Sequence, residues 1–244
     1  NVGAAFTYDM TDIKSGGGLG KSENKTYGLD LFASHTLDDA KRLYVAGDFG
    51  FGVSRGENKR YGVTAANLTA TGNTSGISMH ASAELGYKAD LWQDAVLTPY
   101  AGLSFVQNRM DASQESLPGA QGMALGYAAN TEESLEGVIG ASLAQGFKLG
   151  NGWTLTPSVG AAWHHQLGDN NDGTVATHFA GSAGTNFNTN LGAIAKDALE
   201  LNAGVSVQLT SHLSASVTAK TYQSMDSDAK GHQNSLGASL KYDF

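Results

Sequence analysis

Histidines and carboxylates come together at one place in the chain where they could activate a water molecule. His164 and His165 precede Asp169 and Asp172, and a carboxylate beside an imidazole can act in general base catalysis of peptide hydrolysis. Adjacent residues of a strand point to opposite faces, so the two histidines would not easily share one metal ion. The spacing matches no catalytic motif, and the alternative is an acidic, solvated loop.

Two other patterns resemble functional sites but do not form one. His80 and Ser82 share a strand face, but a hydrolase acting on membrane lipid would need the pair on an apolar face, and this face is polar. The glycines at 16–20 lack the Lys–Ser/Thr of a phosphate-binding loop. Without cysteine, disulfides and thiolate metal sites are excluded. We therefore expect no catalytic residue, no metal, no cofactor and no enzymatic activity.

Composition limits the class of protein. The formal net charge is −8, which argues against nucleic acid as a partner because phosphate binding needs clustered Lys and Arg. Only 16% of residues are charged, which does not fit a disordered chain. No run of about 18 apolar residues predicts a transmembrane helix. A membrane strand needs only about ten alternating residues, so a membrane protein built of strands stays open.

The elements that carry these residues are strands with a two-residue period. The last stretch places five apolar residues on one face: Leu236, Ala238, Leu240, Tyr242 and Phe244. Small or polar residues occupy the other face. A final aromatic residue is typical of an outer-membrane barrel, where it can join the interfacial girdle. The alternative is a sandwich strand that happens to come last.

The connections indicate the architecture. The alternation predicts about ten strands and no helix. Long loops are expected at 11–25, 55–75, 111–133, 168–196 and 224–232, and short turns at 38–41, 90–95, 150–152 and 210–212. Outer-membrane barrels have long loops at one rim and short turns at the other, and an even strand number places both termini at the short-turn rim. Greek-key sandwiches mix their loop lengths instead.

The two strand faces differ in chemistry. One face is apolar, and the other holds glycine, small polar residues and scattered charges. The charged residues are Asp30, Asp48, Glu84, Lys88, Glu200 and Lys220. A charge facing lipid at mid-depth costs about 2–4 kcal/mol, so we predict that these six face a lumen. The predicted fold class is an all-β transmembrane antiparallel up-and-down β-barrel, as one domain over residues 1–244. A half-solvated antiparallel sheet would alternate in the same way.

The chain resembles the C-terminal translocator β-barrel domain of autotransporters, the type V secretion family of Gram-negative bacteria. Four stretches carry the resemblance, in order along nearly the whole chain: YGLDLFAS (27–34), WTLTPSVG (153–160), DALELNAGVS (197–206) and LGASLKYDF (236–244). The family pattern implies twelve strands and a linker helix inside the lumen. This chain departs from it, because Asn1 begins where the third strand would lie. Either the linker helix and the first two strands are absent from this sequence, or the barrel is a shorter variant of about ten strands.

The resemblance implies a function and a set of partners. The barrel would translocate an N-terminal passenger domain and anchor it at the cell surface. It would lie in the outer membrane with both barrel termini periplasmic, in contact with lipid, its own passenger and linker helix, periplasmic chaperones and the barrel-assembly machinery. The last strand, with Tyr242 and Phe244, would be the assembly signal.

Two alternatives remain open at this point. The chain could instead be a passive porin, or an adhesin that binds through its long loops. Some autotransporters cleave their linker with a luminal acidic residue. The candidates here, because they lie on the predicted lumen face, are Asp30, Asp48 and Glu84. The simpler interpretation is that these carboxylates hydrate the pore or pair with Lys88 and Lys220.

Overall fold

The computed structural model is an antiparallel all-β protein. It describes residues 1–15, 18–63, 66–92, 94–150, 152–168, 174–181, 186–190, 195–226 and 231–242. Its long strands are β1 (Val2–Lys14), β2 (Gly20–Thr36), β3 (Leu43–Val63), β4 (Leu68–Tyr87), β6 (Ala95–Met110), β9 (Asn130–Gln145), β11 (Thr154–Gln166), β14 (Asp197–Gln208), β15 (Leu213–Ser224) and β16 (His232–Tyr242). The short elements are β5 (Ala89–Asp90), β7 (Ser113–Ser116), the 3-10 helix η2 (Gln121–Met123), β8 (Leu125–Tyr127), β10 (Phe147–Lys148), β12 (Thr174–Phe179) and β13 (Asn186–Asn190).

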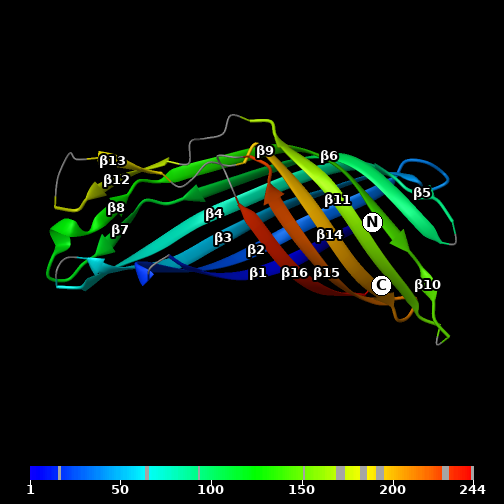
Figure 1. Ribbon diagram of the computed structural model, residues 1–244, viewed down its shortest axis with the longest axis horizontal. Coiled ribbons are helices and arrows are strands. Elements are labelled where there is room, and N and C mark those ends of the chain that lie inside the picture. Colours follow the sequence, from blue (N-terminus) through cyan, green and yellow to red (C-terminus); the bar gives the residue numbers. More distant parts are fainter. Residues whose placement is uncertain are drawn as a thin grey trace.

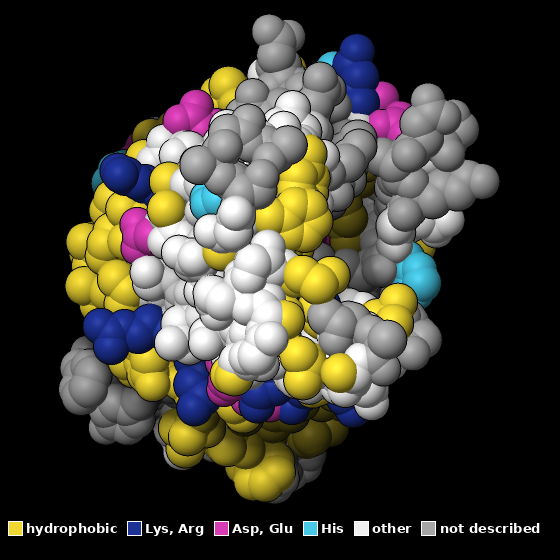
Figure 2. Space-filling model, turned by 90° about the vertical axis from the view of Figure 1, so that its left-hand side faces the viewer, with side chains coloured by type: hydrophobic (Ala, Val, Ile, Leu, Met, Phe, Trp, Pro, Cys, Tyr) yellow, Lys and Arg dark blue, Asp and Glu magenta, His cyan; other side chains and the backbone are white. Residues whose placement is uncertain are grey.

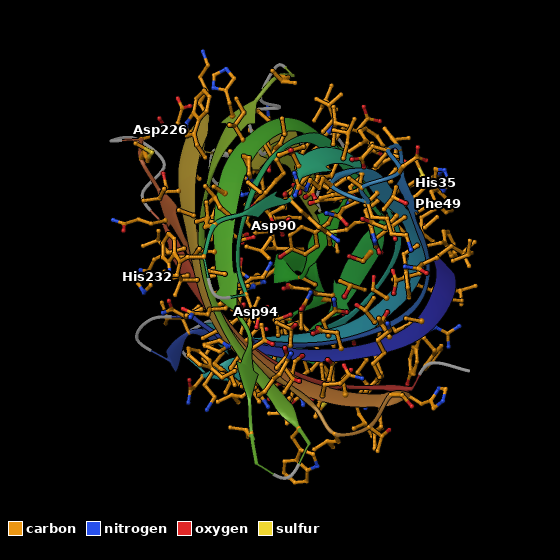
Figure 3. The ribbon with its side chains drawn as sticks, turned by 90° about the vertical axis from the view of Figure 1, so that its right-hand side faces the viewer. His35, Phe49, Asp90, Asp94, Asp226 and His232 are labelled. Atoms are coloured by element: carbon orange, nitrogen blue, oxygen red, sulfur yellow. The ribbon has the colours of Figure 1, made fainter. Side chains whose placement is uncertain are left out.

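The ten long strands form an up-and-down barrel. Each pairs antiparallel with the next long strand in the chain, from β1 to β16, and viewed end-on they form a ring around a central space (Figure 3). In the part of the chain that the structure describes, no backbone pairing links β1 to β16. No helix there is long and apolar enough to cross a membrane. The predicted fold class is confirmed, with ten long strands.

Short turns and both termini lie at one end of the barrel. The amino group of Asn1 donates to the carbonyl of Ser34 near the end of β2, and Tyr242 pairs with Leu213 at the start of β15. The short strands β5 and β10 belong to turns at this same end (Figure 1). The predicted tight turn at 150–152 is present, with Gly152 at φ +83° and its N–H bonded to the Leu149 carbonyl at 3.0 Å.

Two of the predicted long loops at the opposite end are wrong. Residues 11–14 and 20–25, and residues 55–63 and 68–75, belong to strands that pair up to Lys14↔Lys21 in the first hairpin and Val63↔Leu68 in the second. Their polar sequence suggested loops, but antiparallel pairing satisfies the backbone groups of polar segments as well as it does those of apolar segments. At these two positions the connection is therefore short, and the residues expected in a long loop lengthen the strands instead.

Two other long connections fold into a small sheet at the same end. β7 pairs with β4 and β8, and β8 pairs with β12, which pairs with β13. This rim sheet, defined as β7, β8, β12 and β13, projects from the left-hand end of the barrel in Figure 1. It packs over a small core of Val63, Ala70, Leu117 and Ala124, with exposed fractions of 0–6%.

The apolar face of the long strands is exposed. Leu29, Phe49, Ile139 and Val159 are each more than half exposed, and Figure 3 places Phe49 on the outer side of the ring. A half-solvated soluble sheet would bury this face against a second layer. Among the described residues the hydrophobic core cluster is the one at the rim sheet, so the soluble-sheet alternative does not fit.

Candidate functional site

The polar face carries three clusters of charged side chains, each built across neighbouring strands. In the first, His80 of β4 lies between two carboxylates: its Nε2 is 3.4 Å from Asp30 Oδ1 and 3.3 Å from Asp48 Oδ2. The Ser82 hydroxyl donates to Asp48. The register aligns Asp30 with Gly50 and Gly50 with His80. A side chain at Gly50 would collide with the His80 ring, since its Cβ would lie 2.1 Å from Cε1.

The second cluster lies near the short-turn end. The Tyr44 hydroxyl of β3 donates to Glu84 Oε1 of β4 at 2.6 Å. The ammonium of Lys88 lies 5.4 Å from the centroid of the Tyr44 ring, a cation–π distance. Tyr44 therefore contacts an acidic and a basic residue.

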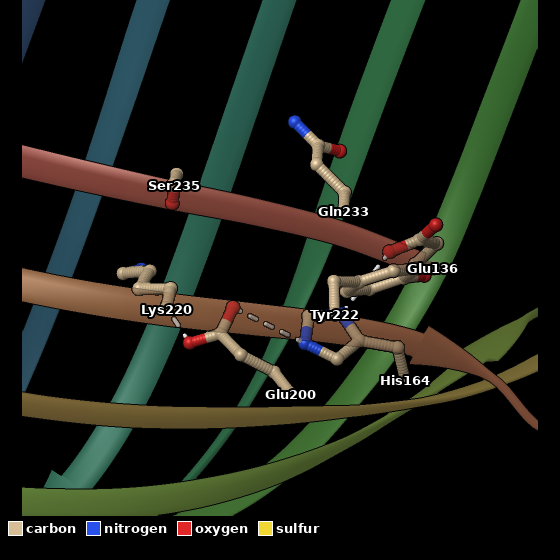
Figure 4. Close-up of a pocket in the computed structure, with 7 residues that line it drawn as sticks. All are labelled: Glu136, His164, Glu200, Lys220, Tyr222, Gln233 and Ser235. Atoms are coloured by element: carbon tan, nitrogen blue, oxygen red, sulfur yellow. Dashed lines mark hydrogen bonds and ion pairs between the residues drawn. The ribbon is translucent and has the colours of Figure 1, made fainter. Parts of the chain in front are cut away.

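The third cluster lines a cavity of about 250 Å³ (Figure 4). His164 of β11 lies between Glu136 and Glu200, with Nδ1 3.2 Å from Glu136 and Nε2 3.8 Å from Glu200. Lys220 of β15 forms an ion pair with Glu200 at 3.4 Å. The Tyr222 ring packs edge-on against His164, with centroids 5.2 Å apart. Four strands thus contribute to one charged network.

All six sequence-predicted polar residues fall in these clusters, which bring them together in pairs. Asp30 joins Asp48, Glu84 joins Lys88 through Tyr44, and Glu200 joins Lys220. Sequence reasoning missed three residues that connect them, Tyr44, Glu136 and Tyr222, and it considered His164 only as part of a rim site. Each lies on the polar face of its strand. The two-residue period combined with the strand register would therefore have identified them.

The two histidines at the rim end of β11 do not form one site. His164 faces Glu136, whereas His165 Nδ1 lies 2.8 Å from Asp197 Oδ1, which also accepts from Trp163 Nε1 at 3.0 Å. Asp169 and Asp172, the acidic part of the predicted rim protease, lie outside the described residues, as does Phe244. Within the described ranges no group of three or more His, Asp or Glu side chains is arranged to hold a metal ion.

The comparisons with known proteins decide the family. The model of the family described as "Autotransporter beta-domain" matches residues 1–220. The chain belongs to the autotransporter β-domain family. It is accordingly an outer-membrane β-barrel that serves the secretion of a passenger domain. No curated protein matches the chain.

Two solved structures show the same fold as this autotransporter domain. The translocator domain of autotransporter NalP from Neisseria meningitidis has 20% identity and a TM-score of 0.69, with all of this chain and 76% of that chain covered. The beta domain of the Bordetella autotransporter BrkA has 18% identity and a TM-score of 0.68, with all of this chain and 83% of that chain covered. At this identity the likeness concerns the fold, and the family match carries the function.

Proposed function

We propose that the passenger crosses the membrane through the lumen lined by the three charged clusters. The support is one observation: the same sheet exposes an apolar face outside and carries an ion-paired polar face inside. The charged side chains of the lumen wall pair with one another. They keep the pore hydrated, and no unpaired charge among them would bind the passing chain. The barrel thus acts through solvation and through the antiparallel pairing of its ten long strands, without catalysis.

Surface display of the passenger tests this proposal. A folded reporter is placed N-terminal to Asn1 in the full-length chain, and intact cells are treated with an external protease. We expect the reporter to be digested while a periplasmic protein stays intact. A reporter that stays protected, although the heat-modifiable barrel is present in the outer membrane, would contradict translocation and favour a porin.

A loop-mediated adhesin is the second candidate, and the rim sheet favours it. Unlike a mobile loop, this sheet packs over a buried core that it shares with the ends of β3 and β4. Deletion of the rim sheet would then abolish cell adhesion but leave passenger display intact. A translocator alone would show no adhesion to lose.

We propose further that the barrel is oriented with its short-turn end in the periplasm. We also propose that the barrel-assembly machinery and the periplasmic chaperones recognise β16. The support is that both ends of the chain pair at that end of the barrel. Deleting Phe244, or changing it to Asp, is expected to lower the amount of heat-modifiable barrel in the outer membrane. Unchanged barrel levels would contradict the assigned assembly signal.

A further inference from the structure

The outer face of β1, β2 and β3 continues beyond the apolar band as three rows of charged residues. Cross-strand register aligns Lys25 with Arg55 in the first row. The second row holds Asp12, Glu23 and Glu57, and the third holds Lys14, Lys21 and Lys59. The rows contain five cations and three carboxylates, which leaves a surplus of two positive charges. This local surplus occurs in a chain whose net charge is −8.

The first row borders the apolar band directly. Two residues closer to the short-turn end, Tyr27 lies directly opposite Val53 on one side and Tyr8 on the other. The rings of Tyr8 and Tyr27 have centroids 5.1 Å apart, and both are about half exposed. Two residues of a strand span about 7 Å. The charges of Lys25 and Arg55 therefore begin at headgroup depth if this aromatic border marks the membrane interface.

Two carboxylates of the second row form ion pairs with lysines of the third row. The Lys21 ammonium donates to Glu23, and Lys59 Nζ lies 3.2 Å from Glu57. Lys25 and Arg55 are exposed and form no ion pair among the described residues, although the charge of Lys25 also acts on Glu23. Seen from the loop end, Lys and Arg side chains gather at the lower edge of the molecule next to hydrophobic surface (Figure 2). The free positive charge thus lies beside the band.

We propose that Lys25 and Arg55 bind the phosphate of an acylated lipid headgroup in the outer leaflet, whose chains pack on Tyr8, Tyr27 and Val53. The guanidinium of Arg55 supplies a fork of donors that suits a phosphate, and the lysine stem can lie along the apolar surface. A peptide or free phosphate would use the charges but not the adjoining apolar surface. The proposal rests on the proposed orientation, in which the loop end faces out of the cell.

The test measures lipid binding by the purified barrel in neutral detergent with native mass spectrometry. The probes are an acylated glycolipid carrying two phosphates, the same lipid with its phosphates removed, and inorganic phosphate as a competitor. We expect K25Q/R55Q to weaken binding of the phosphorylated lipid by about thirty-fold, because each cation near an anionic lipid surface contributes about fivefold. The dephosphorylated lipid should bind wild type and variant equally weakly.

Two control variants separate charge from fold. K41Q/K148Q removes two exposed cations at the short-turn end and should bind the phosphorylated lipid as wild type does. K25R/R55K keeps both charges and should retain binding. If K25Q/R55Q does not fold, lysine labelling of the wild-type protein replaces it, since the phosphorylated lipid should protect Lys25 and leave Lys148 reactive.

Each contrary result overturns a defined part of the account. Equal binding by K25Q/R55Q and wild type, or equal labelling of Lys25 with and without lipid, would refute the site. Full competition by inorganic phosphate would show a free-anion site in place of a lipid site. Passenger display is measured in the same cells: display without selective lipid binding would refute this site alone, whereas lipid binding without display would refute translocation alone.

Discussion

At the scale of single residues, Gly50 determines how a charged cluster can form. It lies between Asp30 and His80 in the register of three strands, and the space above it is filled by the imidazole ring. A glycine in a strand often marks such a close approach. The two-residue period shows that Gly50 is on the polar face, but only the register shows that His80 crosses over it.

Substituting Gly50 tests this arrangement. Gly50→Ala should push the His80 ring away from Asp30 and Asp48 and cost about 1–3 kcal/mol in the free energy of unfolding. The Nε2 chemical shift of His80 reports the displacement, and urea unfolding in lipid reports the cost. Gly150→Ala, where a Cβ meets nothing within 4 Å, is the control and should change neither. An unmoved His80 signal in Gly50→Ala would contradict the assigned packing.

The Lys21–Glu23 pair, which lies beyond the apolar band, gives a pH-dependent prediction. The hydrogen bond from Lys21 lowers the pKa of Glu23 below its usual 4.5. Because the folded-state pKa is depressed, the pair stabilises above pH 4.5 and loses this contribution as the pH falls through the folded value. Carboxyl NMR should show that Lys21→Gln raises the pKa of Glu23 toward 4.5, whereas Lys148→Gln has no effect. A pKa that Lys21→Gln leaves unchanged would mean that the pair does not form in solution.

At the scale of elements, the rim sheet depends on one buried carboxylate. Glu115, only 6% exposed, accepts from Arg60 at 3.1 and 2.5 Å and from the Leu125 amide at 2.9 Å. Three segments that are distant in sequence therefore meet at one side chain. Nothing local in the sequence around Glu115 indicates these partners, because the contacts join residues 55 and 10 positions apart.

Removing this carboxylate should release the rim sheet from the barrel. Glu115→Ala leaves the Leu125 amide without its acceptor and Arg60 with the Met123 carbonyl at 3.2 Å, which we expect to cost about 2–3 kcal/mol locally. Hydrogen exchange at Leu125 and proteolysis within 111–129 should both accelerate, while the barrel keeps its heat-modifiable migration. Glu57→Ala, an exposed carboxylate on the outer face, should leave both rates unchanged. Equal exchange at Leu125 in the two variants would contradict the proposed anchor.

The elements also show what the sequence could predict. The ten long strands, their faces and the short turns follow from the two-residue period and turn residues such as Gly152. The sequence did not predict the two hairpin extensions, because stretches rich in Lys, Glu and Asn are typical of loops. Only the strand register shows that such residues have cross-strand partners, as Glu23 has in Glu57 and Lys21 has in Lys59. The rim sheet was missed because strands as short as β8 carry too few residues to show a period.

At the scale of the whole molecule, the outer surface of the barrel exposes many large hydrophobic side chains. Val205 and Ser206 are neighbours in β14, and their side chains point to opposite faces of the sheet. Val205 is 44% exposed. Val205→Lys should lower the free energy of unfolding in lipid by about 1–3 kcal/mol, because it places a charge on the lipid-facing surface between mid-depth and the interface. Ser206→Lys adds the same charge to the polar face and should cost much less. Equal costs would contradict the assignment of lipid to one face.

The most direct test of lipid outside and water inside uses the absence of cysteine from the chain. Single cysteines are placed along β14 at Leu201, Asn202, Ala203, Val205, Ser206 and Val207, and the membrane-embedded protein is treated with a water-soluble thiol reagent. The account predicts labelling at positions 202 and 206 and protection at 201, 203, 205 and 207. Uniform labelling along the strand, or labelling of the odd positions, would contradict it.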